Sequence, residues 1–280
     1  MYELPEDHPG FSDPEYRARR AAIGEVGETY QPGEPIPEVE YIEEEDDVWR
    51  VVSSELAVKH RKYACRDYLE GAEALDLRRD RVPQLQQVSE KLQALTRFGI
   101  RPVPGLVPTK IFYGSLADRR FMSTQYIRHH SVPFYTPEPD VIHELVGHCN
   151  SLGNQRFADL YEVAGQACRR VAESEDAVDF FSRVWWFTLE FGVIWEDGEP
   201  KTYGAGLLSS YGEIEEFHKA DLRPWDIAAM GVHDYDITKY QPLLFAAESM
   251  NQVFDELTKF FTEFDLDSHD RWRQQATSAS

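Results

Sequence analysis

Apolar residues recur at helical spacing in several separate stretches of this chain. Trp49, Val52, Leu56 and Tyr63 lie on one face of a helix that begins near residue 48. In the stretch VPQLQQVSEKLQAL, residues 82–95, apolar positions again follow a period of about 3.6, and its early proline is tolerated in a first helical turn. The same criterion predicts three further helices, at residues 157–171, 177–191 and 243–264.

Other stretches lack this periodicity. Residues 99–113 carry three prolines and two glycines among β-branched residues, which predicts a structured loop or short edge strands. Residues 1–47 hold six of the 16 prolines and show no helical or strand period, so we expect an extended or disordered arm, a solvated tail without a specific binding role. Residues 265–280 form a C-terminal tail without heptads. The pattern predicts a mainly α fold, a helical bundle with a few short strands, in one domain over residues 48–264.

The net charge narrows the classes of partner. The chain has 29 basic and 50 acidic residues, a net charge of −21. The first 47 residues contribute 15 acidic and 3 basic residues, or −12, so the remainder carries −9. This acidity disfavours nucleic acid and anionic membranes as partners.

No stretch approaches the roughly 18 to 20 apolar residues of a membrane span, and no signal-peptide pattern is present. Three cysteines without metal-finger spacing favour reduced thiols, so we expect a cytoplasmic protein.

Two histidines with an unusual spacing are the first candidates for chemistry. His143 and His148 lie five residues apart in the segment HELVGH. On a regular helix, at about 100° per residue, side chains five apart point about 140° away from each other. Gly147 allows the helix to end and the chain to turn, so that the second ring can reach the same point. We interpret the pair as two metal ligands at a helix terminus, with two hydrogen-bonded structural histidines as the alternative.

Glu190 supplies the third candidate ligand. It lies in the apolar segment WWFTLEFG, where a buried carboxylate is costly without a cation partner. Two imidazoles and one carboxylate leave three coordination positions open, an arrangement typical of non-haem Fe(II) oxygenases. Catalytic zinc uses the same ligand types, so the ligands alone do not decide the metal. The aromatic surroundings favour oxygen chemistry over hydrolysis.

Several long segments resemble the aromatic amino acid hydroxylases, the pterin-dependent phenylalanine, tyrosine and tryptophan hydroxylases. The resemblance extends from about Asp47 to about Phe261 and keeps its segments in order. It implies the mainly α-helical catalytic domain of that family, with His143, His148 and Glu190 as catalytic residues and iron ligands. The segments are TQYIRHHSVPFYTPEPDVIHELVGH, WWFTLEFG and YGAGLLSSYGE, with DRVPQLQQVSEKLQ, RPVPGL and YQPLLFAAES in support.

The resemblance also implies the cofactors, namely Fe(II) and tetrahydrobiopterin or a related tetrahydropterin, with O2 as co-substrate. In this interpretation Phe112 stacks on the pterin ring, and the backbone of Val107 and the side chain of Glu144 form hydrogen bonds with it. Glu144 has an alternative role as the first-turn acid of a helix. Trp185 stands where the family commonly has tyrosine. The implied pterin contacts are Gly105, Leu106, Val107, Phe112, Glu144 and Trp185.

An aromatic amino acid substrate needs a cation for its carboxylate. By resemblance that cation is Arg128, held in place by Asp140, and a simple internal salt bridge is the alternative. Trp186 is typical of the phenylalanine and tyrosine enzymes, and Ile237 stands where tyrosine hydroxylases carry aspartate. His129 and His130 receive no role and are expected on the surface. The implied substrate contacts are Arg128, Thr136, Pro139, Asp140, Trp186, Gly206, Ser209 and Ile237.

These residues favour hydroxylation of L-phenylalanine to L-tyrosine. The alternatives are 5-hydroxylation of L-tryptophan, meta-hydroxylation of L-phenylalanine and, more remotely, a zinc hydrolase or a catalytically silent binding protein. The chain lacks the regulatory domain and the C-terminal tetramerisation helix of animal members, so we expect a monomer. Asn150 departs from the proline that the family usually has after the second histidine, which affects the local loop shape.

Overall fold

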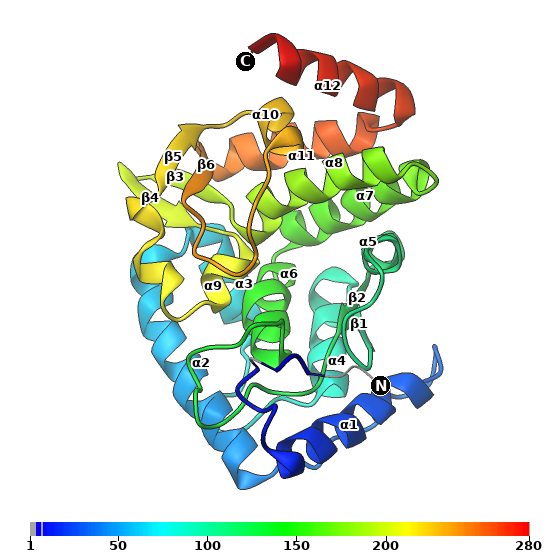
Figure 1. Ribbon diagram of the computed structural model, residues 1–280, viewed down its shortest axis with the longest axis vertical. Coiled ribbons are helices and arrows are strands. Elements are labelled where there is room, and N and C mark those ends of the chain that lie inside the picture. The colour runs from blue at the N-terminus through cyan, green and yellow to red at the C-terminus, as the bar shows by residue number, and fades with distance from the viewer. Residues whose placement is uncertain (1–3, 7, 280) are drawn as a thin grey trace.

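The computed structural model describes residues 4–6 and 8–279 and is built mainly from helices (Figure 1). The helices predicted near residues 48, 82 and 157 are present, and the one predicted at 177–191 is present as α8 (Glu175–Trp185) followed directly by a π-helix over Trp186–Glu190. The mainly α fold is therefore confirmed. Apart from a helix in the N-terminal arm, the longer helices are α2 (Glu43–Tyr63), α3 (Arg66–Leu75), α4 (Leu85–Thr96), α7 (Gln155–Val171), α8, α11 (Met250–Glu263) and α12 (Leu266–Ala279).

Two small sheets complete the fold. One pairs β1 (Gly99–Pro102) with β2 (Arg120–Ser123) in parallel. The other has the order β4-β3-β6-β5, in which β6 (Leu243–Ala247) pairs in parallel with both neighbours. The remaining strands of this sheet are β3 (Val193–Glu196), β4 (Glu199–Thr202) and β5 (Asp221–Pro224).

The helix predicted over residues 243–264 is wrong in its first part. Leu243–Ala247 is a strand whose five residues are all buried. A continuous apolar run of this length is typical of a parallel strand covered on both faces, and it carries no period that separates strand from helix. The helix begins only at Met250, where the side chain of Ser249 accepts a hydrogen bond from the backbone N–H of Gln252.

The loop predicted over residues 99–113 also needs correction at its end. Residues 99–102 form β1, as the expectation of short strands allowed, but α5 (Thr109–Leu116) begins inside the predicted stretch. Pro108 directly precedes this helix and occupies its N-cap position. The prolines therefore separate a strand from a helix instead of excluding both.

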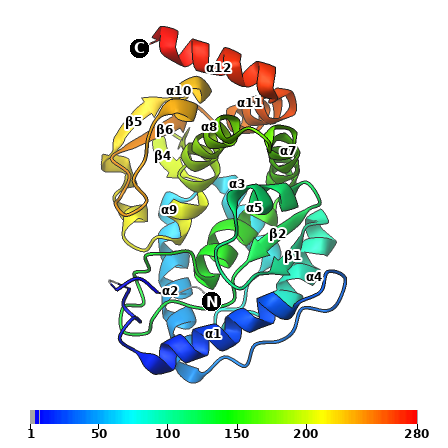
Figure 2. The same ribbon diagram turned by 45° about the vertical axis from the view of Figure 1, so that its right-hand side comes forward.

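The N-terminal arm contains a helix, so its prediction as extended or disordered is wrong for residues 14–29. Helix α1 (Pro14–Thr29) starts with a proline in its first turn, and the side chain of Asp13 caps it by accepting hydrogen bonds from the backbone N–H groups of Glu15 and Tyr16. Figure 2 shows α1 crossing one end of the molecule, below β1 and α4. Its apolar stripe is short, which is why hydrophobic periodicity did not reveal it.

Polar contacts hold α1 against the segment that carries Arg128. The hydroxyl of Tyr16 donates to the backbone carbonyl of Ile127 at 3.0 Å. Arg20 forms an ion pair with Glu138, and both side chains are buried. The Arg20 guanidinium also lies 3.7 Å from the centre of the Tyr126 ring. The expectation of a solvated tail is therefore not met for α1.

His129 belongs to the same junction and is not the surface residue that we expected. It is 7% exposed, its Nε2 lies 3.2 Å from a carboxylate oxygen of Asp13, and its ring packs edge-on against Tyr16. The C-terminal tail also differs from a featureless extension, because residues 266–279 form α12. The phenyl ring of Phe180 in α8 packs edge-on against the His269 ring of α12.

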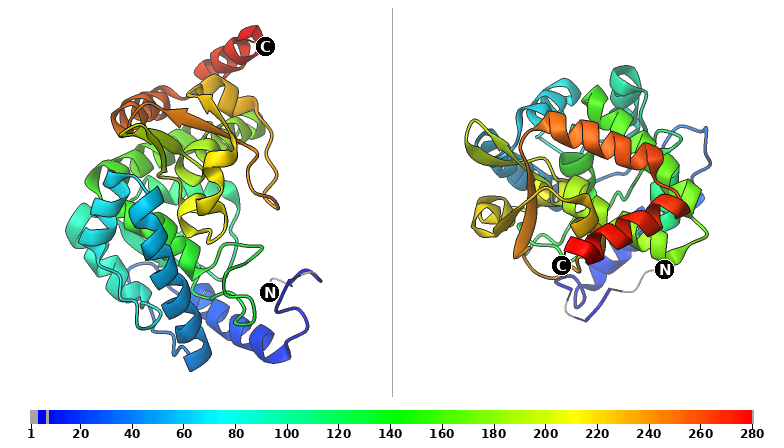
Figure 3. Two further views of the ribbon diagram at one scale, coloured as in Figure 1. Left: turned by 90° about the vertical axis from the view of Figure 1, so that its left-hand side faces the viewer. Right: turned by 90° about the horizontal axis from the view of Figure 1, so that it is seen from above.

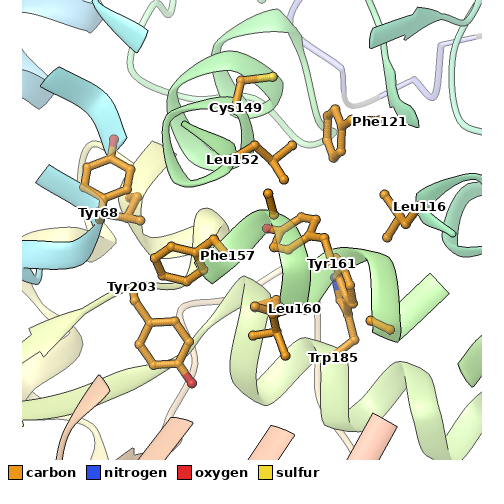
Figure 4. Packing of buried hydrophobic residues seen from close by; sticks show 14 of the residues in the cluster. Tyr68, Leu116, Phe121, Cys149, Leu152, Phe157, Leu160, Tyr161, Trp185 and Tyr203 are labelled. Carbon is orange, nitrogen blue, oxygen red and sulfur yellow. The ribbon is translucent and has the colours of Figure 1, made fainter. Parts of the chain in front are cut away.

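The main hydrophobic core lies between α7 and α8 and the helices around them. Figure 4 shows Phe157, Tyr161 and Trp185 pointing into this core. The rings of Tyr161 and Trp185 have centroids 5.0 Å apart at an interplanar angle of 69°, and those of Phe121 and His148 are 4.9 Å apart. The aromatic core therefore reaches directly to one of the candidate metal ligands.

The buried ion pair of α1 gives a first prediction. We expect Arg20→Ala to lower the free energy of unfolding by about 3 kcal/mol, because it removes the guanidinium from the buried Glu138 carboxylate and leaves it the His8 ring, 3.5 Å away. Denaturant unfolding followed by circular dichroism measures the change. Arg50→Ala is the matched control, since its ion pair with Asp47 is exposed and should contribute less than about 1 kcal/mol. Equal losses in the two variants would contradict the structural role of Arg20.

Candidate active site

The two histidines lie on a π-helix, not at a helix terminus. The π-helix runs over His143–Cys149, and the backbone N–H of Asn150 bonds to the carbonyl of Leu145, five residues earlier. With i→i+5 hydrogen bonds, residues five apart come round to the same side of the helix. The Nε2 atoms of His143 and His148 are consequently 3.1 Å apart. The predicted meeting of the two rings is confirmed, but the predicted helix end is wrong.

Gly147 therefore has a packing role. The helix continues through it, and a Cβ atom at this position would lie 2.8 Å from the backbone oxygen of Ala205. The absence of a side chain lets α9 (Ala205–Ser209) approach the π-helix closely.

Glu190 comes from a second π-helix, which runs over Trp186–Glu190 and continues α8. The backbone N–H of Phe191 donates to the carbonyl of Trp186 at 2.8 Å, again five residues earlier. One carboxylate oxygen of Glu190 lies 3.1 Å from His148 Nε2, and the other lies 3.8 Å from His143 Nε2. The indole N–H of Trp185 donates to the first of these oxygens at 3.1 Å. The three side chains offer ligand atoms within 4.8 Å of one another and could hold a metal ion.

Each imidazole has a second partner at its other nitrogen. Nδ1 of His143 lies 2.9 Å from the Ser209 hydroxyl, which itself donates to the carbonyl of Ala205 at 2.8 Å. The Ser209 oxygen therefore accepts from Nδ1–H, which leaves the lone pair of His143 Nε2 available for a metal. Nδ1 of His148 lies 2.9 Å from the buried hydroxyl of Tyr161. The donor set fits a metal ion bound through both Nε2 atoms.

The protonation states agree with this fit. Burial lowers the pKa of His143 to about 4, so that ring is neutral at pH 7. Burial alone would raise the pKa of Glu190, but the two histidines and the Trp185 hydrogen bond outweigh it, and the pKa falls to about 2. A neutral imidazole and an ionised carboxylate are the forms that bind metal ions.

The residues implied for the pterin fall into two groups. Phe112 packs edge-on against Trp185, with ring centroids 6.2 Å apart, and so lies near the metal-ligand cluster. Glu144 is buried on the first π-helix and accepts a hydrogen bond from the Thr124 hydroxyl at 3.5 Å. Burial raises the pKa of Glu144 well above its usual value, and the charge of Glu190 acts in the same direction. The second group, Gly105, Leu106 and Val107, forms the more open loop before α5.

Arg128 and Asp140 form a buried pair next to the first histidine. The Nε and Nη2 atoms of Arg128 each donate to an Asp140 carboxylate oxygen at 2.8 Å, and the Arg128 backbone N–H adds a bond of 2.9 Å. Asp140 also accepts from the backbone N–H of His143 at 3.2 Å. The bonds to Asp140 leave Nη1 of Arg128 as the donor for another carboxylate.

The other residues implied for the substrate differ in their surroundings. The rings of Trp186 and Phe191 have centroids 4.4 Å apart and are tilted by 32°, and a Cβ on Gly206 would meet this Phe191 ring at 2.7 Å. Thr136 bonds locally to the carbonyl of Glu138, and Ile237 is 69% exposed. Two predicted residues have other partners in the structure: Ser209 contacts His143, and the carbonyl of Pro139 accepts from Tyr126.

Sequence reasoning missed three residues behind Trp186. The ring of Tyr235 stacks on the Trp186 indole at 4.1 Å and 9°. The indole N–H donates to the side chain of Gln241 at 3.2 Å, and the Gln241 backbone N–H donates to the buried Glu213 carboxylate at 2.6 Å. Tyr161 was missed as well, because it counted only as a member of an apolar stripe. A hydroxyl within such a stripe is the signal that could have identified it.

Comparison with known proteins defines the class of protein. Residues 1–278 match the family model described as biopterin-dependent aromatic amino acid hydroxylase, so the chain belongs to this family of enzymes. Membership of this family confirms the predicted pterin cofactor. The predicted iron is confirmed with it, and the structure offers the His143, His148 and Glu190 cluster that could hold the metal.

Individual relatives add detail. The chain is 48% identical over 261 residues to phenylalanine 3-hydroxylase of Streptomyces coeruleorubidus, covering 93% of both chains. It is 40% identical over 264 residues to human phenylalanine-4-hydroxylase, covering 92% of this chain but 58% of that protein.

Solved structures agree with this assignment. The apo phenylalanine hydroxylase of Colwellia psychrerythraea matches with a TM-score of 0.79 at 30% identity, over 90% of this chain and 94% of that one. The enzyme of Chromobacterium violaceum, solved with iron(III) and the oxidised cofactor 7,8-dihydrobiopterin, matches with a TM-score of 0.73 at 32% identity, over 79% and 82%.

Two further findings concern membrane-spanning helices and the cysteines. Within the described residues, none of the helices combines the length and apolar character needed to cross a membrane. Cys65, Cys149 and Cys168 are all buried and free.

The hydrogen bond between Nδ1 of His148 and the Tyr161 hydroxyl gives a second prediction. We expect Tyr161→Phe to weaken Fe(II) binding by about tenfold, because it removes the group that orients the ring. Titration of the metal-free protein against a competing chelator under anaerobic conditions measures the affinity. Tyr203→Phe is a matched control, since its hydroxyl is buried without a hydrogen-bond partner among the described residues. Unchanged Fe(II) affinity in Tyr161→Phe would show that Tyr161 does not support the metal site.

Proposed function

We propose that this protein hydroxylates the aromatic ring of L-phenylalanine, using O2 and a tetrahydropterin. The observation that carries the proposal is the direct connection between a carboxylate-binding group and the metal-ligand cluster. Asp140 bonds both to Arg128 and to the backbone of His143. An amino acid bound by its carboxylate at Arg128 is thereby positioned relative to the candidate metal.

His143, His148 and Glu190 are the residues that would hold Fe(II). When bound, the iron and the pterin supply the oxygen activation that protein side chains cannot provide. Ser209 fixes the His143 ring and Tyr161 fixes the His148 ring. The aromatic wall of Phe112, Trp185 and Trp186 keeps water from the reacting ring. The residues that we propose to contact the pterin are those implied by the family resemblance, namely Gly105, Leu106, Val107, Phe112, Glu144 and Trp185.

The substrate contacts are proposed in the same way. Nη1 of Arg128 takes the substrate carboxylate, and Trp186 and Gly206 border the slot for the ring. Tyr235 and Gln241 hold the Trp186 indole from behind. Thr136, Pro139, Ser209 and Ile237 complete the proposed set.

The ring position is a separate part of the proposal. Hydroxylation at carbon 4 was the expectation from the family. The relative that is 48% identical over nearly its whole length is a phenylalanine 3-hydroxylase, and this favours carbon 3. Nuclear magnetic resonance of the product distinguishes the two, because a meta-substituted ring and a para-substituted ring give different coupling patterns.

We further propose that the protein acts as a cytoplasmic monomer. The three free and buried thiols support a reducing compartment. Light scattering of the purified protein checks the oligomeric state, and a stable tetramer would contradict this part.

Loss of the carboxylate ligand gives a third prediction. We expect Glu190→Ala to lose both iron binding and turnover, because two imidazoles alone hold the metal weakly. The assay loads the protein anaerobically with Fe(II) and then adds O2 and tetrahydrobiopterin, with phenylalanine, tyrosine and tryptophan compared. Glu199→Ala is the control, since this carboxylate is exposed and pairs with Lys201. Retained iron and activity in Glu190→Ala would refute the site assignment.

The proposed role of Arg128 gives a fourth prediction. The double variant Arg128→Gln, Asp140→Asn removes the guanidinium without leaving a buried unpaired charge. We expect the KM for phenylalanine to rise at least tenfold, the loss of about 1.5 to 3 kcal/mol typical of a charged hydrogen bond, while Fe(II) affinity is retained. Steady-state kinetics and metal titration measure the two effects. An unchanged KM would mean that the pair is only structural.

A further inference from the structure

A cavity borders the π-helix that carries His143 and His148. It has a volume of about 520 Å³ and lies between α2 and α3, with the turn after α3 at one side. The left panel of Figure 3 brings α2 and α3 to the front. Val146 and Asn150 form its boundary with the π-helix. None of the residues proposed for iron, pterin or substrate lines it.

The cavity has an apolar wall and a size suited to a small molecule. Pockets of about 300 to 1,000 Å³ are typical of small-molecule sites. The half-buried side chains on its wall are apolar and come from α2, α3 and the following turn. They are Ala57, Leu69, Ala72 and Leu77.

Two arginines of the cavity lack ion-pair partners. Arg61 and Arg79 form no ion pair and no hydrogen bond with any residue in the described part of the chain. Arg78 between them differs, because Asp80 holds its guanidinium with bonds of 2.8 and 2.6 Å. Two unpaired cations at one cavity are notable in a chain with a net charge of −21.

The charge of Arg79 reaches the buried end of the cavity. Burial lowers the pKa of His60 to about 4, and the Arg79 charge acts in the same direction. Burial raises the pKa of Tyr68, and the Arg79 charge opposes that rise. His60 is therefore neutral, and Arg79 carries the positive potential there.

Two buried polar oxygen atoms of the cavity also lack hydrogen-bond partners among the described residues. The hydroxyl of Ser53 and the side-chain oxygen of Asn150 have none among the described residues, although both side chains are more than nine-tenths buried. An unsatisfied buried polar group costs about 1 to 3 kcal/mol. A bound molecule with a polar group at this end could offset that cost.

We propose that this cavity is a binding site for a small organic monocarboxylate with an apolar body. Arg61 and Arg79 bind the carboxylate, and the apolar wall between α2 and α3 covers the body. Glu73 and Asp76 also line the cavity and would repel a multiply charged anion such as a nucleotide. Their presence favours a ligand with a single negative charge over one with several.

Occupancy of the cavity acts on the π-helix through hydrogen bonds. The Tyr68 hydroxyl donates to the carbonyl of Val146 at 2.8 Å. The Asn150 side chain donates to the Tyr68 hydroxyl at 3.0 Å and to the Val146 carbonyl at 3.2 Å. A ligand packed against Val146 and Asn150 therefore restrains the helix between the two histidines. The departure of Asn150 from the proline usual in the family provides this connection.

Isothermal titration of the full-length, metal-free protein with 2-naphthoate tests the proposal. We expect saturable binding that weakens at least tenfold in the double variant Arg61→Gln, Arg79→Gln. The neutral analogue 2-naphthamide should bind at least tenfold more weakly than 2-naphthoate. Arg101→Gln is the matched control, because Arg101 is an exposed arginine outside the cavity. Its substitution removes one positive charge, as each of the two cavity substitutions does. Circular dichroism confirms that each variant is folded.

The double variant Arg128→Gln, Asp140→Asn separates this cavity from the proposed amino acid site without leaving a buried unpaired charge. Binding of 2-naphthoate should stay within twofold of the parent in this variant. Loss of binding in Arg128→Gln, Asp140→Asn, with binding retained in the Arg61→Gln, Arg79→Gln protein, would overturn the proposal, as would the absence of binding at millimolar 2-naphthoate. Hydrogen exchange tests the connection to the π-helix: the amides of residues 143–150 should exchange more slowly with ligand, and unchanged exchange would overturn that part.

Discussion

The i→i+5 backbone hydrogen bonds of two π-helices are the constraint on which the site depends. One helix brings His143 and His148 to the same side, and the other carries Glu190 toward them. An α-helical path would direct the two histidine rings about 140° apart. π-Helical turns are rare and often occur at functional sites. Here the wider turns are the feature that lets three side chains from two helices converge on one point.

The convergence also depends on packing from other parts of the chain. Each candidate ligand has an outer partner on a different element: Ser209 of α9 for His143, Tyr161 of α7 for His148 and Trp185 of α8 for Glu190. The close approach of α9 requires a glycine at position 147. The metal-ligand geometry is thus a property of the assembled core, which extends to His148 through the ring of Phe121.

The acidic N-terminal segment illustrates how net charge can mislead. Its local charge of −12 indicates a solvated arm, yet specific pairs hold it to the segment that bears Arg128. Arg20 pairs with Glu138, and Asp13 both caps α1 and contacts His129. Individual buried contacts, which a charge sum does not describe, attach this helix to the catalytic domain.

The sequence by itself determined the helices with wide apolar stripes, the His143, His148 and Glu190 set, and the family. Side-chain chemistry and local periodicity suffice for these, because both are written in consecutive residues. Only the tertiary structure decided that residues 243–247 form a strand, that residues 14–29 form a helix, and that the helix after His143 widens instead of ending. The strand pairs with both neighbours, α1 makes polar contacts with residues more than 100 positions away in sequence, and the π-helix packs closely against α9. Each depends on partners distant along the chain, which a local pattern does not contain.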